Sequence, residues 1–268
     1  MRLPFEAALH VAFAALAGLL IGSFLNVCIY RVPRDLSVVR PRSFCPECGK
    51  PVAWFDNIPI LSYILLRGRC RHCAQPIGIR YPLVELTTAL FFACSVYQYG
   101  WHLTGLKWCL FQAIMTVLFW VDLEERILPD EFTLGGSALG LLFAFFTKVP
   151  GDLGALLLPS VSTRGQSLFE GFAGAFVLTL PLAAIGFLWS KITKREVLGL
   201  GDVKLLPCIG IFLGVQAGIQ TLLLGSLLGV AIGGVYIFIR KKKAREYELP
   251  LGSFYCAAAV FTSLFMKF

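Results

Sequence analysis

Eight apolar segments constrain the fold of this 268-residue chain more than any other feature. Each one approaches the length that crosses about 30 Å of hydrocarbon. The segments cover residues 8–30, 83–100, 105–121, 132–147, 168–189, 203–217, 219–239 and 250–266. The stretch 203–239 is too long for one crossing, so we divide it at its glycines. Hydrophobic residues make up 57% of the chain and charged residues 15%, which excludes an ordinary soluble domain. We therefore expect an all-α polytopic membrane protein with about eight transmembrane helices.

The distribution of basic residues predicts the orientation of these helices. Eight crossings place 19 of the 24 lysines and arginines on one side, in the loops 31–82, 123–131, 190–204 and 240–249. Since basic residues accumulate in cytoplasmic loops, this side is predicted to be the cytoplasmic one, with both termini outside. Membrane topology then explains the net charge of +8 without a nucleic-acid partner.

The first apolar segment has an alternative interpretation as a cleaved secretory signal. It is longer than a signal core, and it leads into Arg31 and Arg34 instead of a polar exported domain. These features favour a retained first helix.

The loop 31–82 carries two C-x-x-C pairs, Cys45 with Cys48 and Cys70 with Cys73. Four thiolates complete a tetrahedral structural zinc site, and a cytoplasmic location disfavours disulfides. The alternative is that each pair acts as a redox dithiol, but no thioredoxin-like pattern surrounds either pair. His72 lies within the second pair and is expected to be a bystander, because the cysteines already fill the ligand shell.

Asp122 and Asp202 are the strongest candidates for catalysis. Asp122 directly follows one apolar segment and Asp202 directly precedes another, both at the predicted cytoplasmic face. Carboxylates beside a bilayer are costly. Gly199 and Gly201 flank Asp202 and permit close approach by another segment. If the two carboxylates meet, they can share one proton and activate water by general acid and base catalysis. The structural alternatives are a helix end for Asp122 and a helix cap for Asp202.

Four other polar residues near the apolar segments have structural and functional interpretations. Asp130 is expected to be a helix N-cap. Lys204 is either a surface lysine or a group that tunes the aspartates. Glu85 either complements a helix dipole or has a functional role, and Asn26 is expected to make an interhelical hydrogen bond.

Small residues predict where helices approach one another closely. The glycines with suitable spacing are Gly18 with Gly22, Gly225 with Gly229, and Gly229 with Gly233. We divide the chain into a first transmembrane helix over 1–30, a cysteine loop over 31–82 and a transmembrane domain over 83–268.

Several motifs occur together in one order along the chain. They are Gly22-Ser-Phe-Leu-Asn-Val-Cys-Ile-Tyr-Arg-Val-Pro33, the two cysteine pairs, Asn57-Ile-Pro-Ile-Leu-Ser62, Arg80-Tyr-Pro-Leu-Val-Glu-Leu86, Asp122 with Leu128-Pro-Asp130, and Gly-Leu-Gly-Asp202-Val-Lys. The chain thereby resembles the bacterial prepilin peptidases, or type IV leader peptidases, from residue 22 to about residue 206. Glu124 and Glu125 stand where relatives often carry other residues, which leaves Asp122 and Asp130 unaffected.

The resemblance implies an inner-membrane aspartic endopeptidase that removes the basic leader of type IV prepilins or type II secretion pseudopilins. It assigns catalysis to Asp122 and Asp202. It also implies N-methylation of the new amino terminus with S-adenosylmethionine, an activity of relatives that have the cysteine loop. No glycine-rich methyl-donor motif is visible, so the residues of that second site and the oligomeric state stay open.

Two other classes of function compete with this interpretation. A zinc-ribbon membrane scaffold of a pilus or secretion system would need the cysteine loop but neither aspartate. A transporter would use the aspartates as a proton relay, yet such sites usually lie near the bilayer midplane, whereas both aspartates are predicted at one face.

Overall fold

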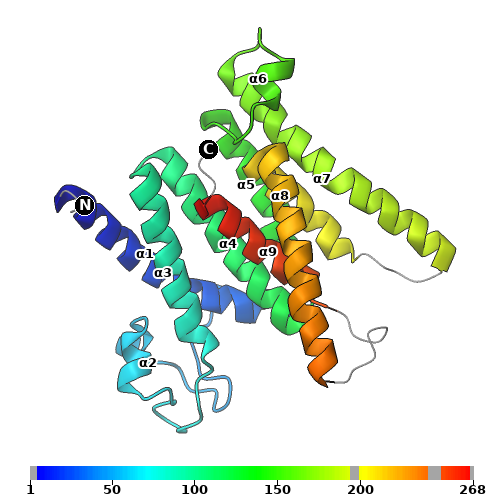
Figure 1. Ribbon diagram of the computed structural model, residues 1–268. Coiled ribbons are helices and arrows are strands. Elements are labelled where there is room, and N and C mark those ends of the chain that lie inside the picture. Colours follow the sequence, from blue (N-terminus) through cyan, green and yellow to red (C-terminus); the bar gives the residue numbers. More distant parts are fainter. Residues whose placement is uncertain (1–4, 194–198, 241–248, 266–268) are drawn as a thin grey trace. The chain divides into compact units, whose positions relative to one another are not determined.

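The computed structural model describes residues 5–193, 199–240 and 249–265, which form helices and loops (Figure 1). Within these ranges there is no β-strand, and only two isolated β-bridges occur, Phe44 with Pro51 and Arg69 with Pro76. The predicted all-α fold is therefore confirmed. The chain forms two compact units, Met1–Val117 and Leu118–Phe268, which are described separately below.

The first unit is built around two long helices, α1 (Phe5–Arg31) and α3 (Arg80–Tyr99), and includes the start of α4 (Leu103–Glu125). Gly18 and Gly22 bring α1 against the backbone of α3, as their spacing predicts. A Cβ atom on Gly18 would lie 2.6 Å from Ala89 Cα, and one on Gly22 would lie 2.7 Å from Glu85 Cα. The two helices thus pack backbone to backbone.

The segment between α1 and α3 has little regular structure. Its short helices are η1 (Val32–Arg34), η2 (Trp54–Asn57) and α2 (Leu61–Leu65). The Arg31 side chain is only 4% exposed and organises the start of this segment. Its guanidinium donates hydrogen bonds to the carbonyl oxygens of Ser37, Pro41 and Arg42 at 2.8, 2.8 and 3.2 Å. Arg31 is thus a structural residue as well as a contributor to the basic loop.

The second unit contains the end of α4 and five further helices. These are α5 (Asp130–Phe146), α6 (Leu153–Leu157), α7 (Thr163–Thr193), α8 (Leu200–Arg240) and α9 (Leu251–Phe265). Helix α8 packs against α5, α7 and α9. The predicted glycine 225 of α8 faces Tyr255 of α9, and glycine 233 faces Leu249, two residues before α9 begins; these side chains fill the space that a larger residue would need.

Helix α8 is broken at Gly214, one of the glycines at which the sequence predicts a division. Gly214 has φ 72° and ψ −173°, a conformation that essentially only glycine adopts. Glu170 of α7 lies at the break, where its Oε1 accepts a hydrogen bond from Val215 N at 3.3 Å and its Oε2 accepts one from Gly154 N at 3.0 Å. The buried carboxylate therefore accepts from the Val215 backbone donor at the break and also holds the start of α6 through Gly154.

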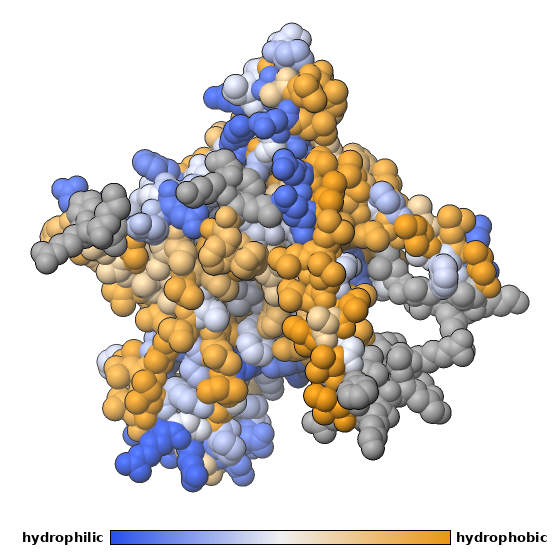
Figure 2. All heavy atoms as spheres, in the orientation of Figure 1, coloured by the Kyte–Doolittle hydropathy of each residue, from blue (hydrophilic) through white to orange (hydrophobic). Residues whose placement is uncertain are grey.

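The predicted apolar segments coincide with α1, α3, α4, α5, α7, the two parts of α8, and α9. Four helical stretches are long and apolar enough to cross a membrane, namely Phe5–Arg34, Leu103–Glu125, Thr163–Ile192 and Leu200–Tyr236. Large apolar side chains are exposed on these helices; on α7, Phe176, Leu180 and Phe187 are each about 60% exposed. Figure 2 shows this apolar surface over α7 and α8. Such a surface suits contact with lipid.

A total of eight crossings and the sidedness of the loops remain predictions. Two of the basic clusters that predict the orientation fall on residues 194–198 and 241–248, which lie outside the described residues.

Candidate functional site

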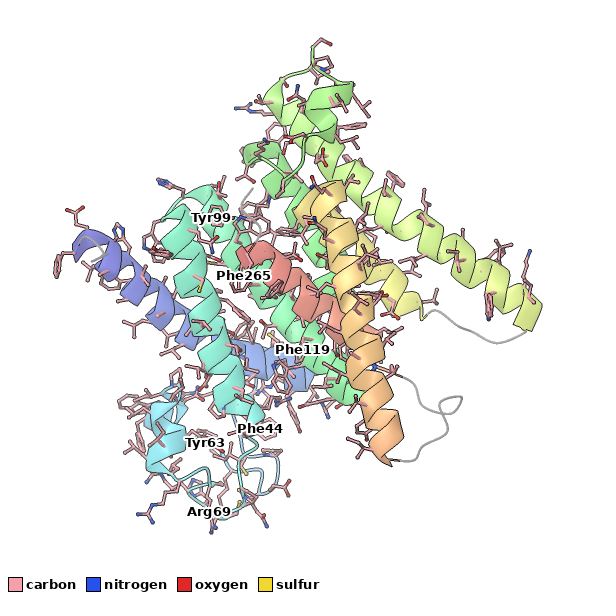
Figure 3. All side chains as sticks on the ribbon, in the orientation of Figure 1. Phe44, Tyr63, Arg69, Tyr99, Phe119 and Phe265 are labelled. Carbon is pink, nitrogen blue, oxygen red and sulfur yellow. The ribbon has the colours of Figure 1, made fainter. Side chains whose placement is uncertain are left out.

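Asp122 lies in the last turn of α4 and is only 6% exposed, whereas Leu123, Glu124 and Glu125 after it are exposed. Its Oδ2 accepts two hydrogen bonds from Ser253 at the start of α9, one from the backbone N at 2.6 Å and one from Oγ at 2.7 Å. Ser253 Oγ also contacts Phe119 O at 3.0 Å, and Figure 3 labels Phe119 on α4. Asp122 is therefore held inside the unit and is not a solvated helix end.

Asp202 lies in the first turn of α8 and is half-buried. The helix begins at Leu200, and the Asp202 backbone N donates to Gly199 O at 3.1 Å. The prediction of Asp202 as a cap for a helix starting near Val203 is therefore wrong, because the helix starts three residues earlier. Within the described residues its carboxylate has no hydrogen-bond donor, in contrast to that of Asp122.

The two aspartates are brought together through Leu128. A Cβ atom on Gly201 would lie 3.2 Å from Leu128 Cβ, and one on Gly252 would lie 2.9 Å from Leu128 Cδ1 and 3.1 Å from Asp122 Oδ2. Leu128 thus contacts Gly201, the residue before Asp202, and lies beside Gly252, which approaches Asp122, with glycine at the points of closest approach.

Lys204 and Asp130 form an ion pair beside this site. Lys204 Nζ lies 2.7 Å from Asp130 Oδ1 and 2.9 Å from Oδ2. Both side chains are about half exposed. Asp130 is the first residue of α5 and makes no capping bond, since Pro129 occupies the N-cap position. The N-cap prediction for Asp130 is therefore wrong, and Lys204 pairs with that aspartate instead.

The four predicted metal ligands form one cluster in the first unit. One sulfur atom from each of Cys45, Cys48, Cys70 and Cys73 lies within 4.8 Å of every other. The Sγ atoms of Cys45 and Cys73 are 3.9 Å apart, and all four thiols are free. Tetrahedral zinc with bonds of about 2.3 Å separates its sulfur ligands by about 3.8 Å, so the geometry fits a metal. His72 is not part of the cluster.

The two cysteine pairs have the same backbone conformation. Cys45 N donates to Lys50 O and Cys70 N donates to Gln75 O, both at 2.9 Å. The residue after each second cysteine has a positive φ, 68° at Gly49 and 56° at Ala74. This tight turn directs both sulfur atoms of a pair to one point.

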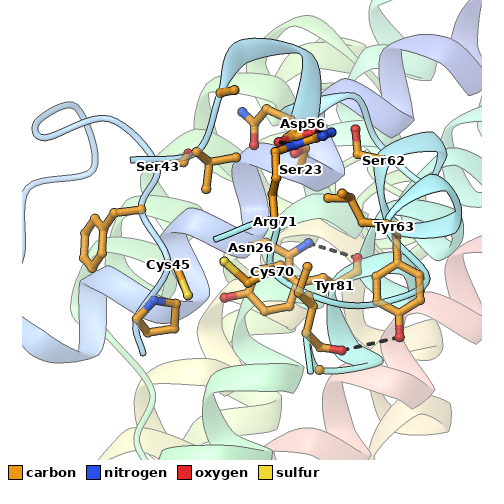
Figure 4. A pocket seen from close by; sticks show the side chains of 18 of the residues that line it. Ser23, Asn26, Ser43, Cys45, Asp56, Ser62, Tyr63, Cys70, Arg71 and Tyr81 are labelled. Carbon is orange, nitrogen blue, oxygen red and sulfur yellow. Dashed lines mark hydrogen bonds and ion pairs between the residues drawn. The ribbon is translucent and has the colours of Figure 1, made fainter. Parts of the chain in front are cut away.

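A cavity of about 370 Å³ lies in the first unit between α1, the cysteine loop and the start of α3 (Figure 4). Cys45 and Cys70 of the cluster form part of its wall, as do Asp56 and Arg71. Arg71 contacts both carboxylate oxygens of Asp56, at 2.6 and 2.7 Å, and this guanidinium holds the pKa of Asp56 below its ordinary value.

Glu85 and Asn26 form the deep part of the cavity wall. Glu85 is 8% exposed, and its Oε2 accepts a hydrogen bond from Ile60 N at 2.7 Å. Ile60 has φ 60°, which is unusual for a β-branched residue. Glu85 therefore fixes the loop to α3, and its expected interaction with the helix dipole is wrong because it lies beyond the first turn. Asn26 Nδ2 donates to Tyr81 O at 3.1 Å, which confirms the predicted interhelical bond.

Sequence reasoning missed two residues of the second unit, Ser253 and Glu170. Ser253 is separated from Asp122 by 131 positions and has no local signature. Glu170 did carry a signal, since it is an acidic residue inside a predicted apolar segment.

Two family models match the chain. The Bacterial Peptidase A24 N-terminal domain matches residues 16–99, and the Type IV leader peptidase family matches residues 109–234. No solved protein structure matches the chain.

Curated relatives cover most of the chain, and the three described here are each named "Prepilin leader peptidase/N-methyltransferase". The protein of Klebsiella pneumoniae is 38% identical over 80% of this chain and 90% of its own length. That of Neisseria gonorrhoeae is 34% identical over 88% of this chain and 85% of its own length. That of Myxococcus xanthus is 38% identical over 84% of this chain, but the match covers 62% of its length.

Proposed function

Because the chain belongs to the type IV leader peptidase family, we propose that it cleaves the basic leader of type IV prepilins or type II secretion pseudopilins and then methylates the new amino terminus. The observation that carries the peptidase activity is the placement of Asp122 and Asp202 around Leu128. The scaffold interpretation is not favoured, since the relatives are named as enzymes.

The two aspartates divide the work of peptide hydrolysis. Asp122 accepts two hydrogen bonds, which suits it to be the charged member that takes a proton from water. Asp202 without a donor suits the protonated member, which hydrogen-bonds the scissile carbonyl oxygen. Water oxygen bonds to the carbonyl carbon, and the tetrahedral intermediate then breaks its C–N bond as a proton passes to the leaving nitrogen.

The proposed substrate matches the predicted topology. A prepilin presents a basic leader on the cytoplasmic side of an apolar helix, so its scissile bond lies at the inner boundary of the bacterial inner membrane. The exposed Glu124 and Glu125 follow Asp122 directly and would attract a basic leader.

Replacing Asp122 or Asp202 with Asn should abolish cleavage of a prepilin in detergent or liposomes. An amide cannot take a proton from water, and it cannot share a proton with the other carboxylate. Asp152→Asn is the matched control, since Asp152 is an exposed carboxylate of the same unit and lies at the start of α6. Full cleavage activity in either active-site variant would contradict the assignment.

The cysteine cluster is proposed to bind one structural zinc ion through Cys45, Cys48, Cys70 and Cys73. The thiolates of four cysteines are the ligand set that zinc prefers, and a loop with few buried residues gains order from a metal. Zinc here would hold the two cysteine pairs together and take no part in cleavage of the peptide bond.

Metal analysis of the purified protein should give one zinc per chain, and Cys45→Ser or Cys70→Ser should lose it. Cys94→Ser removes a thiol of α3 outside the cluster and should keep the metal. A metal-free parent protein would favour the dithiol interpretation.

S-adenosylmethionine is the proposed methyl donor, and when bound it supplies a methyl group on a positively charged sulfonium. The new amino terminus must reach that methyl group as a neutral amine.

A further inference from the structure

We infer that the cavity of the first unit binds the sulfonium methyl donor, with Glu85 as the carboxylate that faces its positive charge. This inference rests on the proposed methylation activity and assigns it a site. The cavity of about 370 Å³ falls within the range of about 300–1,000 Å³ typical of small-molecule sites.

Four basic residues line the cavity, and none of them forms an ion pair with Glu85; two of them, Lys50 and His72, are exposed. Arg31 directs its guanidinium to three backbone carbonyl oxygens, and Arg71 is bound by both oxygens of Asp56. Among the described residues no ion pair involves Glu85. A buried carboxylate without a cation is costly, so a cationic ligand would be stabilised there.

The hydrogen-bonding capacity of Glu85 supports this role. Its Oε2 accepts from Ile60 N, and its carboxylate also receives a bond from the Ser23 side chain. An ionised carboxylate has about four acceptor positions, so two remain for a ligand.

Asn26 adds a second unsatisfied acceptor to the same wall. Its Nδ2 donates to Gly22 O and Tyr81 O, whereas its buried Oδ1 has no partner. Buried polar atoms are normally paired, which indicates that a donor on a bound molecule completes this site. The methyl donor offers such groups in its ammonium and its adenine amine.

The remaining surface of the cavity suits the adenosine part of the donor. Phe44, Tyr63 and Ile77 line the cavity and provide apolar surface. Figure 4 labels Tyr63 in the wall, and Figure 3 labels Phe44 and Tyr63 in the cysteine loop. Since Cys45 and Cys70 also belong to the wall, a metal in the cluster would fix one side of the cavity. The cysteine loop thereby acquires a physical connection to methylation.

The test compares binding of S-adenosylmethionine, a cation, with that of S-adenosylhomocysteine, its neutral thioether, by calorimetry on the full-length protein in detergent. Glu85→Gln keeps an oxygen that accepts from Ile60 N but removes the charge. It should weaken binding of the cation by about 10-fold and leave that of the thioether nearly unchanged. Glu131→Gln, an exposed carboxylate of α5, should change neither.

Prepilin cleavage by the Glu85→Gln protein should match that of the parent, which shows that the variant folds. Equal loss of both ligands' affinity, or no loss of either, would overturn the role of Glu85.

Ultraviolet cross-linking of radiolabelled S-adenosylmethionine should label peptides within residues 23–85. Labelling within 118–268 in a protein that methylates its product would overturn the cavity assignment while leaving the proposed function intact. A parent protein that neither binds the donor nor methylates would overturn both.

Discussion

Asp122 receives both of its hydrogen bonds on one oxygen, Oδ2, and both come from Ser253. Among the described residues, the other oxygen accepts no hydrogen bond. The Ser253 hydroxyl positions the carboxylate without touching the substrate, so Ser253 is a positioning residue and not a catalytic one.

Ser253→Ala should lower kcat for prepilin cleavage by about 10- to 100-fold, because a hydrogen bond to a charged group is lost while the backbone bond remains. KM should change little, since the Ser253 hydroxyl acts through Asp122, to which it bonds. Ser263→Ala is the matched control, because it removes a buried hydroxyl of the same helix that donates to Val260 O. An unchanged kcat in Ser253→Ala would show that the backbone bond alone orients Asp122.

The sequence indicated candidate residues where a local pattern restricted their role, and the structure confirms the predicted cluster of four cysteines. Asp202 was recognisable because two glycines surround a carboxylate beside an apolar segment, and the four cysteines were recognisable from their spacing. Ser253 was not, because a serine at the start of an apolar helix is ordinary and its partner lies far away in the sequence. The cap predictions for Asp130 and Asp202 failed because helix ends shift by a few residues with tertiary contacts.

At the scale of elements, the break in α8 determines how Asp202 is presented. The half of α8 before Gly214 carries the aspartate, and the half after it packs against α9. Glu170 of α7 holds the junction by accepting the Val215 backbone donor. The length of the apolar run predicted a break in this region, but only the structure shows the carboxylate that stabilises it.

Gly214→Ala should lower the free energy of unfolding by about 2–4 kcal/mol, because a Cβ atom would collide with Pro150 O in a backbone conformation that excludes side chains. Thermal unfolding in detergent would measure the loss as a lower Tm. Gly234→Ala lies in the same helix, where a Cβ atom meets nothing within 4 Å, and should be neutral or stabilising. Equal Tm values for the two variants would contradict the role of the break.

At the scale of the whole molecule, the two proposed activities reside in different compact units. The cysteine cluster and the cavity lie in Met1–Val117, whereas both aspartates and Ser253 lie in Leu118–Phe268. The apolar segments predicted nearly every long helix, because burial in lipid imposes a length that hydropathy reveals directly. The cavity was not predictable, since its wall combines residues from three segments whose association depends on side-chain contacts.

Asp122→Asn and Asp202→Asn should therefore lose cleavage yet bind zinc and S-adenosylmethionine as the parent protein does. Metal analysis and calorimetry on the same preparation would measure both. Loss of donor binding in either variant would show that the two sites are energetically coupled.

Leu128 fills the space between Gly201 and Gly252, and both glycines are already the smallest residue available. A larger side chain at position 128 could not be accommodated by a second, compensating substitution at either neighbour. A smaller one could be offset only at position 201, because a methyl group at position 252 would also meet Asp122. During evolution, position 128 can therefore change to a smaller residue but not to a larger one.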